Sequence, residues 1–307
     1  MRHTLSVLIA AAATTTPALA DVPKVVTDFI PAQGLVALVM EDLGPPDMLL
    51  GQGANGHDLQ LRPSQTAALA RADLVVWIGP EMSPWLDRTL EGLGNVPQLR
   101  LLSVPGTHLR SVAGAGATND DADDPAEEEG DHHHSGVDPH AWLDPGNAPL
   151  WLDAIAAELA RLDPANAVAY ADNADRAKAA LAATDAEIAH RLAAVRDRPF
   201  VVFHDAYGYF SAHYGLTVAG SVAPGDGHAP GAAHLAELRA RVVAGAVCLF
   251  PETGRDPAYL EQLAEGTDVR IGASLDPEGM AVAPGPDAYP ALLRQLADTL
   301  LDCLGQG

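Results

Sequence analysis

The sequence predicts an α/β protein of two lobes, each built on a mostly parallel sheet, joined by one long rigid helix. Short apolar runs that suit buried strands alternate with segments of helical spacing on both sides of the middle of the chain. An Ala-rich stretch without a helix breaker lies between these two halves. With 307 residues, 48% of them hydrophobic, the chain is long enough to form two cores.

The first 20 residues have the features of a removable secretory signal peptide. Arg2 precedes a short apolar run, and the small residues Ala18 and Ala20 form a cleavage signal before Asp21. We therefore expect export and cleavage after Ala20. No later apolar run approaches the roughly 20 residues that a membrane-spanning helix needs, so the mature chain is not expected to cross a membrane.

Six apolar runs are the strand candidates. They cover residues 24–30, 73–79, 97–104, 199–203, 246–250 and 268–275. Segments 63–72 and 257–266 have the apolar spacing and the Ala and Leu content of short helices. Because strands and helices alternate in both halves, the strands of each sheet are expected to run largely parallel.

Two start signals predict the helices in the middle of the chain. Asp144 offers an N-cap before Pro145, and Asp163 precedes Pro164 in the same way. From Pro164 to about Val195 the chain has no Gly or further Pro, which predicts one helix of roughly 32 residues, about 48 Å long. We therefore expect an N-terminal lobe over 21–163, a linking helix over 164–195, and a C-terminal lobe over 196–307.

The charge and the cysteines limit the function classes. The formal net charge of -23 repels nucleic acid and anionic membrane faces, and it raises the local concentration of cations. The chain has two cysteines, Cys248 and Cys303. In an exported protein they are expected to form a structural disulfide, with a pair of thiolate metal ligands as the alternative.

Four residues stand at positions where binding side chains gather. His204 directly follows the apolar run 199–203, and ligands of open α/β sheets bind outside the carboxyl ends of the strands. A histidine that is merely hydrogen-bonded at a strand end is the alternative. His57, His140 and Asp276 lie in loops at element boundaries. Their spacing along the chain is far longer than that of a local zinc-finger motif.

The other histidines have simpler interpretations. His190 lies among charged residues of the predicted long helix and is expected to face solvent. His108, His213 and His234 have no acidic or histidine partners beside them in sequence, which favours surface or locally hydrogen-bonded roles. Residue composition and spacing thus indicate an exported, acidic, two-lobed protein that binds cations.

Three long segments carry a resemblance to a known family. Segments 57–82 (HDLQLRPSQTAALARADLVVWIGPEM), 138–145 (DPHAWLDP) and 201–216 (VVFHDAYGYFSAHYGL) resemble the high-affinity zinc-uptake solute-binding proteins of bacterial ABC transporters, the ZnuA type. The Pro/Gly segment 224–231, the tail segment 266–279 and the paired cysteines extend the match. It covers almost the whole mature chain in the order of that family.

The resemblance implies a metal site in the cleft between two α/β lobes that one long helix joins. It assigns His57 and His140 as ligands from the N-terminal lobe and His204 as a ligand from the C-terminal lobe. Asp276 stands where the family has a carboxylate that either binds the metal or leaves a water in the fourth position. Some zinc members have a glutamate just before the first histidine, where this chain has Gly56.

The resemblance implies transport rather than catalysis. The expected cargo is Zn²⁺, captured in the periplasm and delivered to an ABC permease of the inner membrane by a monomer. Three imidazoles and one carboxylate suit tetrahedral zinc, whereas manganese-uptake relatives tend to have a carboxylate at the position of His204. The alternatives are a manganese or iron uptake protein of the same fold and a zinc-buffering or adhesin protein without a permease. A zinc hydrolase finds no support in an H-E-x-x-H or G-x-S-x-G motif.

The acidic stretch 113–138 is expected to be a mobile loop, because it has almost no apolar residue to bury. It contains His132, His133 and His134. One interpretation is a solvated, highly charged surface segment. The other is a weak secondary zinc site, in which the neighbouring acids Glu129 and Asp131 supply oxygen ligands. The acidic insert falls where the ZnuA family carries one.

Overall fold

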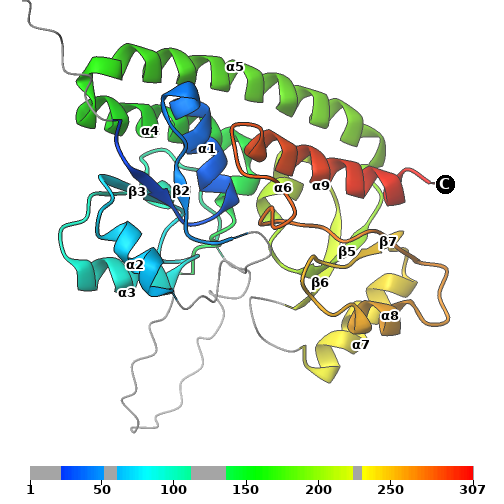
Figure 1. Cartoon of the computed structure of the whole chain (residues 1–307). Helices are drawn as coiled ribbons and strands as arrows, with labels where there is room; N and C mark the ends of the chain where they lie inside the picture. The colour runs from blue at the N-terminus through cyan, green and yellow to red at the C-terminus, as the bar shows by residue number, and fades with distance from the viewer. Residues whose placement is uncertain (1–21, 52–60, 112–135, 224–229, 307) are drawn as a thin grey trace, which may run out of the picture.

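The computed structural model describes residues 22–51, 61–111, 136–223 and 230–306. Two separate sheets lie side by side, and a layer of long helices runs across both of them (Figure 1). The two-lobed α/β class is therefore confirmed. The predicted signal peptide lies outside the described residues, as does nearly all of the acidic loop. Within the described part of the chain, no helix is both long enough and apolar enough to span a bilayer.

The first sheet has four parallel strands in the order β2-β1-β3-β4. Its strands are β1 (Val25–Thr27), β2 (Asp47–Met48), β3 (Leu74–Trp77) and β4 (Gln98–Arg100). The central strands β1 and β3 are fully buried, with Val26 opposite Val75. A strand covered on both faces needs apolar residues at successive positions, which is why these two were recognisable as continuous apolar runs.

The second sheet repeats this arrangement, with four parallel strands in the order β6-β5-β7-β8. Its strands are β5 (Phe200–His204), β6 (Val218–Ala223), β7 (Cys248–Phe250) and β8 (Arg270–Ile271). The central strand β5 pairs with β6 on one side and β7 on the other. The carboxyl ends of β5 and β7 therefore lie next to each other, which decides which side chains meet beyond them.

Nine α-helices cover the sheets within the described residues. They are α1 (Ile30–Met40), α2 (Pro63–Leu69), α3 (Pro84–Leu93), α4 (Ala148–Leu162), α5 (Ala167–Leu192), α6 (Gly208–Tyr214), α7 (Ala232–Val243), α8 (Ala258–Ala264) and α9 (Ala288–Leu304). Helices α2, α3, α4 and α5 begin near a proline, and proline fits the first helical turn because it needs no amide donor there.

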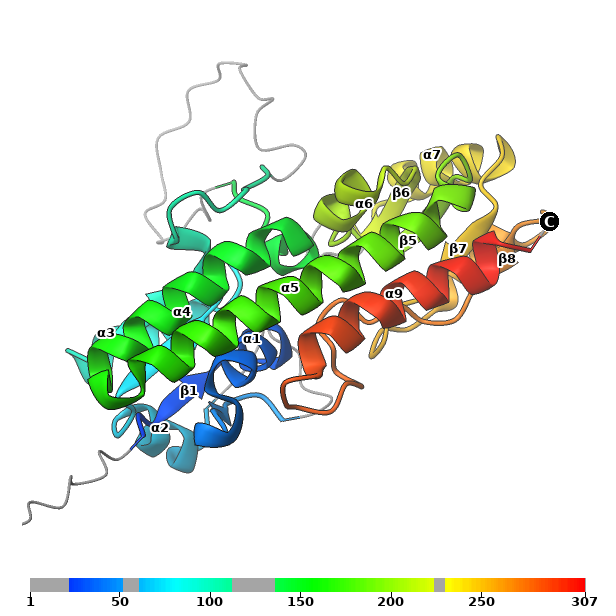
Figure 2. The ribbon, with the colours of Figure 1, turned by 90° about the horizontal axis from the view of Figure 1, so that it is seen from above.

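The long helix was predicted correctly. It comprises α5 with a 3-10 turn at each end, Pro164–Asn166 and Ala193–Val195. The 26 residues of α5 span about 39 Å. Viewed from above, α5 lies between α4 and α9 (Figure 2). Its side chains reach α1 through Asn173, whose amide donates to the Val39 carbonyl at 2.9 Å, and α9 through Thr184, which accepts from Arg294 at 2.8 Å.

The last helix joins the two halves of the molecule. Helix α9 packs against both α1 and α5, so the end of the chain returns to elements formed by its beginning. One buried apolar cluster accordingly runs from Val25 to Leu304 and includes residues of both lobes. A second, smaller cluster that includes Val201, Leu238 and Leu249 lies under α7 and α8 alone.

Several strand predictions were wrong in detail. The run 24–30 ends its strand at Thr27, and α1 begins at Ile30. The run 268–275 forms only the two-residue β8, followed by an isolated bridge between Leu275 and Glu252. Strands β2 and β6 were missed, because β2 has two residues and the sequence of β6, VAGSVA, contains no large apolar side chain.

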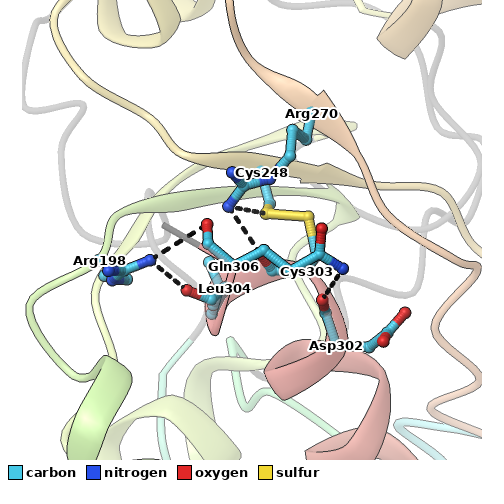
Figure 3. The surroundings of a disulfide bond; sticks show 7 residues. All are labelled: Arg198, Cys248, Arg270, Asp302, Cys303, Leu304 and Gln306. Atoms are coloured by element: carbon cyan, nitrogen blue, oxygen red, sulfur yellow. Dashed lines mark hydrogen bonds between the residues drawn. A yellow bond between two sulfur atoms is a disulfide. The ribbon is translucent and has the colours of Figure 1, made fainter.

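The predicted disulfide is confirmed. Cys248 on β7 and Cys303 on α9 are bonded, across a sequence separation of 55 residues. The Arg270 guanidinium donates to the Cys303 carbonyl at 2.7 Å, beside the bridge (Figure 3). Because both sulfur atoms are in the bridge, the cysteines are not a pair of thiolate metal ligands. The bond fixes the end of α9 to the second sheet.

Candidate metal centre

Two of the predicted ligands meet between the lobes. His204 is the last residue of β5, and His140 directly precedes the 3-10 turn Ala141–Leu143 of the first lobe. Both side chains are buried, with about 3% of their surface exposed. Their Nε2 atoms lie 3.3 Å apart, although 64 residues separate them in sequence. The two halves of the chain thus bring one imidazole each to the same point.

Each imidazole is held by a carboxylate on its other nitrogen. His140 Nδ1 lies 2.7 Å from Asp138 Oδ1, and the same oxygen accepts the backbone N–H of His140. His204 Nδ1 is hydrogen-bonded to Glu252 Oε2. An ionised carboxylate can only accept, so the proton in each ring belongs on Nδ1. That tautomer leaves the lone pair of each Nε2 available for a metal ion.

The spacing of the nitrogens matches a shared metal ion. Two nitrogen ligands at the usual Zn–N distance in a tetrahedral site lie about 3.3–3.4 Å from each other. The observed distance between the Nε2 atoms of His140 and His204 is 3.3 Å. This geometry and the two carboxylate-bound Nδ1 atoms are the arrangement expected of histidine ligands to zinc.

Asp276 lies in the adjoining loop and is 1% exposed. Its two oxygens accept the backbone N–H groups of Met280 at 2.9 Å and Ala281 at 2.8 Å. Each carboxylate oxygen still has a second lone pair. The next residue, Pro277, accepts a hydrogen bond from the Trp142 indole at 2.8 Å, so this loop contacts the segment that carries His140.

The surroundings of the two imidazoles are strongly acidic. Burial raises the pKa of the Tyr207 hydroxyl well above its ordinary value, and Glu252, Asp276 and Glu278 raise it further. Burial also raises the pKa of Asp205, with a further contribution from Asp138, while His140, His204 and Arg110 oppose the shift. Several carboxyl groups therefore lie close enough to interact with one another. Such a site attracts a divalent cation.

The remaining predicted ligands are outside the described residues. His57 belongs to residues 52–60, and His132, His133 and His134 belong to residues 112–135. Over 22–51, 61–111, 136–223 and 230–306, no three or more His, Cys, Asp or Glu side chains are assembled as a metal cage. The described part of the site thus consists of two imidazoles with acidic neighbours.

The two carboxylates that orient the imidazoles were not predicted from the sequence. Asp138 was available as a signal, since it lies two residues before His140 within DPH. The sequence contains no comparable signal for Glu252, because its position beside His204 depends on β5 pairing with β7. Asp205 directly follows His204 and also escaped notice.

A second histidine cluster connects the two lobes away from the imidazole pair. Asp144 binds His108 Nδ1 at 2.7 Å through one oxygen and His213 Nδ1 at 2.9 Å through the other. His213 Nε2 lies 2.9 Å from Asp185 on α5. Asp144 also accepts the backbone N–H of Gly146, as its predicted capping role requires. His108 and His213 thus have acidic partners, which are distant from them in the sequence.

The Asp144 cluster predicts a pH-dependent contribution to stability. Burial raises the pKa of Asp144, but hydrogen bonds from His213 and His108 outweigh it and lower the pKa to about 2. The hydrogen bond to Asp144 raises the pKa of His213 above 6.5, against burial and with help from Asp185. The stabilisation that His213 contributes is therefore complete below pH 6.5 and is lost as the pH rises through its elevated pKa. The stabilisation that Asp144 contributes is complete above pH 3.8 and is lost only as the pH falls towards 2.

We expect His213→Gln to lower the free energy of unfolding of the metal-free protein by about 1 kcal/mol at pH 5–6. The loss should be smaller at pH 9 than at pH 5–6, because the contribution of His213 decreases as the pH rises above 6.5. Urea denaturation at both pH values measures the difference. His190, exposed on α5 as predicted, provides the control His190→Gln, for which no such pH dependence is expected. An equal loss for His213→Gln at both pH values contradicts the charge-based explanation.

Comparisons with known proteins find relatives that match nearly the whole chain. The family model ZnuA, "Zinc-uptake complex component A periplasmic", matches residues 25–303. A relative from Paracoccus denitrificans named high-affinity zinc uptake system protein ZnuA is 46% identical, over 98% of this chain and 98% of its own length. A protein of the same name from Brucella suis is 34% identical over 92% of each chain.

The fold is also found among solved structures. The periplasmic zinc binding protein TroA from Treponema pallidum superposes with a TM-score of 0.76 at 21% sequence identity. The superposition covers 92% of this chain and 99% of TroA, which shows a common fold. Since the family model spans nearly all of the described residues and full-length relatives exceed 30% identity, this chain belongs to the ZnuA family of periplasmic zinc-uptake components.

Proposed function

We propose that this protein captures Zn²⁺ in the periplasm and delivers it to an ABC permease of the inner membrane. The observation that carries the proposal is the 3.3 Å distance between the Nε2 atoms of His140 and His204, each held by a carboxylate on Nδ1. The relatives named as zinc uptake proteins support the same cargo. Zinc is therefore the transported substrate, and no catalytic role is proposed.

The proposed ligand set is His57, His140, His204 and Asp276. Three imidazoles suit a borderline-soft ion, and one carboxylate completes a tetrahedral site. The lone pairs left on the Asp276 oxygens make that residue suitable as the fourth ligand. Imidazole also binds copper and nickel, and copper more tightly by intrinsic affinity, so selectivity depends on geometry and on metal supply.

We also propose how the chain is exported and how its lobes are divided. A signal peptide cleaved after Ala20 would direct the chain to the periplasm, where a monomer would meet the permease. The proposed division is an N-terminal lobe over 21–163, a linking helix over 164–195 and a C-terminal lobe over 196–307. His132, His133 and His134 are proposed as weak secondary zinc ligands, with an acidic surface segment as the alternative.

Zinc binding itself is the test of the function. Metal-free protein should bind one equivalent of Zn²⁺ tightly and gain about 4 kcal/mol of stability when free zinc is 1,000-fold above the dissociation constant. Thermal unfolding and chelator competition with Zn²⁺, Mn²⁺ and Fe²⁺ measure this, and anomalous X-ray scattering identifies metal and ligands. Failure of zinc to stabilise the protein contradicts the proposal. Tighter binding of Mn²⁺ or Fe²⁺ supports the alternative cargo.

The permease requires a separate experiment. Growth of a strain under zinc limitation should depend on this protein together with its permease. Rescue by the protein without any permease would instead support a zinc-buffering or adhesive role. Zinc-dependent turnover of an ester or peptide would revive the hydrolase alternative.

The carboxylate behind His204 should contribute to affinity. We expect Glu252→Gln to weaken zinc binding by about 10–100-fold, because glutamine loses the negative charge and no longer enforces the tautomer of His204. Competition with a chromophoric chelator measures the change. Glu261→Gln, an exposed substitution on α8, is the matched control and should bind as the wild type does. An unchanged affinity in Glu252→Gln contradicts this role.

A further inference from the structure

The segment that carries His140 is held at both ends by tyrosine hydroxyls from the second half of the chain. We call residues 138–142 the His140 segment. Tyr209 on α6 donates to the Asp138 carbonyl at 2.8 Å, and Tyr289 on α9 donates to the Trp142 carbonyl at 2.7 Å. Each contact is two residues from His140, and both tyrosines are almost fully buried. The segment belongs to the first lobe by sequence but is attached to helices of the second half.

The Tyr209 hydroxyl also organises the backbone beside Asp138. It accepts the N–H of Arg110 at 2.7 Å, while the Arg110 carbonyl accepts the N–H of Asp138 at 2.8 Å. One hydroxyl thus connects residues 110 and 138 to α6. Helix α6 begins four residues after His204, so Tyr209 is close in the chain to the other imidazole. The position of Asp138, which orients His140, is therefore fixed relative to the strand that carries His204.

The Tyr289 contact extends this arrangement to the Asp276 loop. Trp142, whose carbonyl accepts from Tyr289, donates through its indole to the Pro277 carbonyl at 2.8 Å. The Trp142 ring also packs against the His140 ring, with centroids 5.1 Å apart. The C-terminal end of the His140 segment is thereby tied to α9 and to the loop that carries the proposed fourth ligand.

We infer that Tyr209 and Tyr289 are positioning residues that set the affinity of the metal site by holding His140 at the correct distance from His204. The inference rests on the proposed zinc-binding function. The 3.3 Å spacing of the two Nε2 atoms is an interlobe distance, and these hydroxyls are interlobe bonds two residues from one of the imidazoles. Because a buried carbonyl without a donor is costly, loss of either hydroxyl lets the His140 segment shift towards another partner.

Substitution by phenylalanine tests the role of each hydroxyl alone. Phenylalanine at 209 retains the ring contacts with His108 and Arg110, so Tyr209→Phe removes little besides the hydrogen bonds. Tyr289→Phe is the second test. The matched control is Tyr170→Phe, because Tyr170 is also buried and donates to Asp163 Oδ2 at 3.1 Å near the start of the long helix.

The readouts are zinc affinity by chelator competition, the zinc release rate, the visible spectrum of the Co²⁺-loaded protein and the unfolding of the metal-free protein. We expect Tyr209→Phe and Tyr289→Phe each to weaken zinc binding by about 10-fold or more, mainly through faster release, and to alter the Co²⁺ bands. Tyr170→Phe should destabilise the metal-free protein while leaving affinity and spectrum unchanged.

Two results overturn the inference. One is wild-type zinc affinity and an unchanged Co²⁺ spectrum in both Tyr209→Phe and Tyr289→Phe. The other is an equal loss of affinity in Tyr170→Phe, which would indicate general destabilisation. In both cases the wild-type protein still binds zinc, so the proposed function stands. A wild-type protein that fails to bind zinc contradicts the proposed function itself.

Discussion

Replacement of His204 by alanine is expected to weaken zinc binding by more than about 100-fold. This loss exceeds the one expected when a residue that only hydrogen-bonds a metal ligand is removed. The variant loses one of two imidazoles whose Nε2 atoms lie 3.3 Å apart, and it leaves the buried Glu252 without its histidine partner. The ion would then have fewer protein ligands and an altered charge distribution around it. Isothermal titration and chelator competition measure the dissociation constant.

The control for this prediction is another histidine of the same lobe. His234 Nε2 bonds the Ser221 carbonyl at 2.8 Å and is not in the proposed ligand set, so His234→Ala should retain wild-type zinc affinity. Replacement of His57 or His140 should resemble His204→Ala, whereas Asp276→Ala should cost less, since water can take the vacated position. Tight zinc binding by His204→Ala contradicts the ligand assignment.

Removal of the disulfide is expected to lower the free energy of unfolding by about 4 kcal/mol. The bridge joins Cys248 on β7 to Cys303 on α9 across 55 residues. Closing a loop of this length reduces the conformational entropy of the unfolded chain, which favours the folded state. The double substitution Cys248→Ser with Cys303→Ser measures the effect by urea denaturation of the metal-free protein. The wild-type protein under reducing conditions should unfold at the same urea concentration as the variant.

The single substitution Cys248→Ser opens the loop but keeps the Cys303 sulfur, so it separates the effect of chain entropy from the effect of losing both buried sulfur atoms. It should destabilise the protein about as much as the double substitution does, since either change opens the loop. A loss below about 1 kcal/mol in the double variant contradicts a major stabilising role for the bridge.

The elements that could be predicted from sequence are those with a strong local signal. The long helix has a proline start and no breaker over its length, and its bounds agree with the prediction. The buried strands β3, β5 and β7 appear as apolar runs because both of their faces are covered. Strand β6 could not be recognised, since its small residues include Gly220 and Ser221 and have no strand-like pattern.

The candidate site was predictable where the chemistry is local and unpredictable where it depends on topology. His204 was identified because it follows an apolar run, and the structure places it at the end of β5. The partner Glu252 required knowledge that β7 lies beside β5. Asp144 contacts His213, which is 69 positions away in the sequence, and Asp138 contacts Tyr209, which is 71 positions away. The residues around each of these positions give no indication of the distant partner.

The packing of α9 has a mechanical consequence. Helices α5 and α9 pack against each other, and both contact α1 (Figures 1 and 2). The disulfide bridge anchors the end of α9 to the second sheet (Figure 3). Two packed helices resist bending better than one, so we expect the two lobes to keep a nearly fixed relative position rather than to open and close about a hinge. Little conformational entropy is then lost on capture, and preorganisation of this kind strengthens binding. We expect the energy needed to release the ion to come from the surface on which the protein docks.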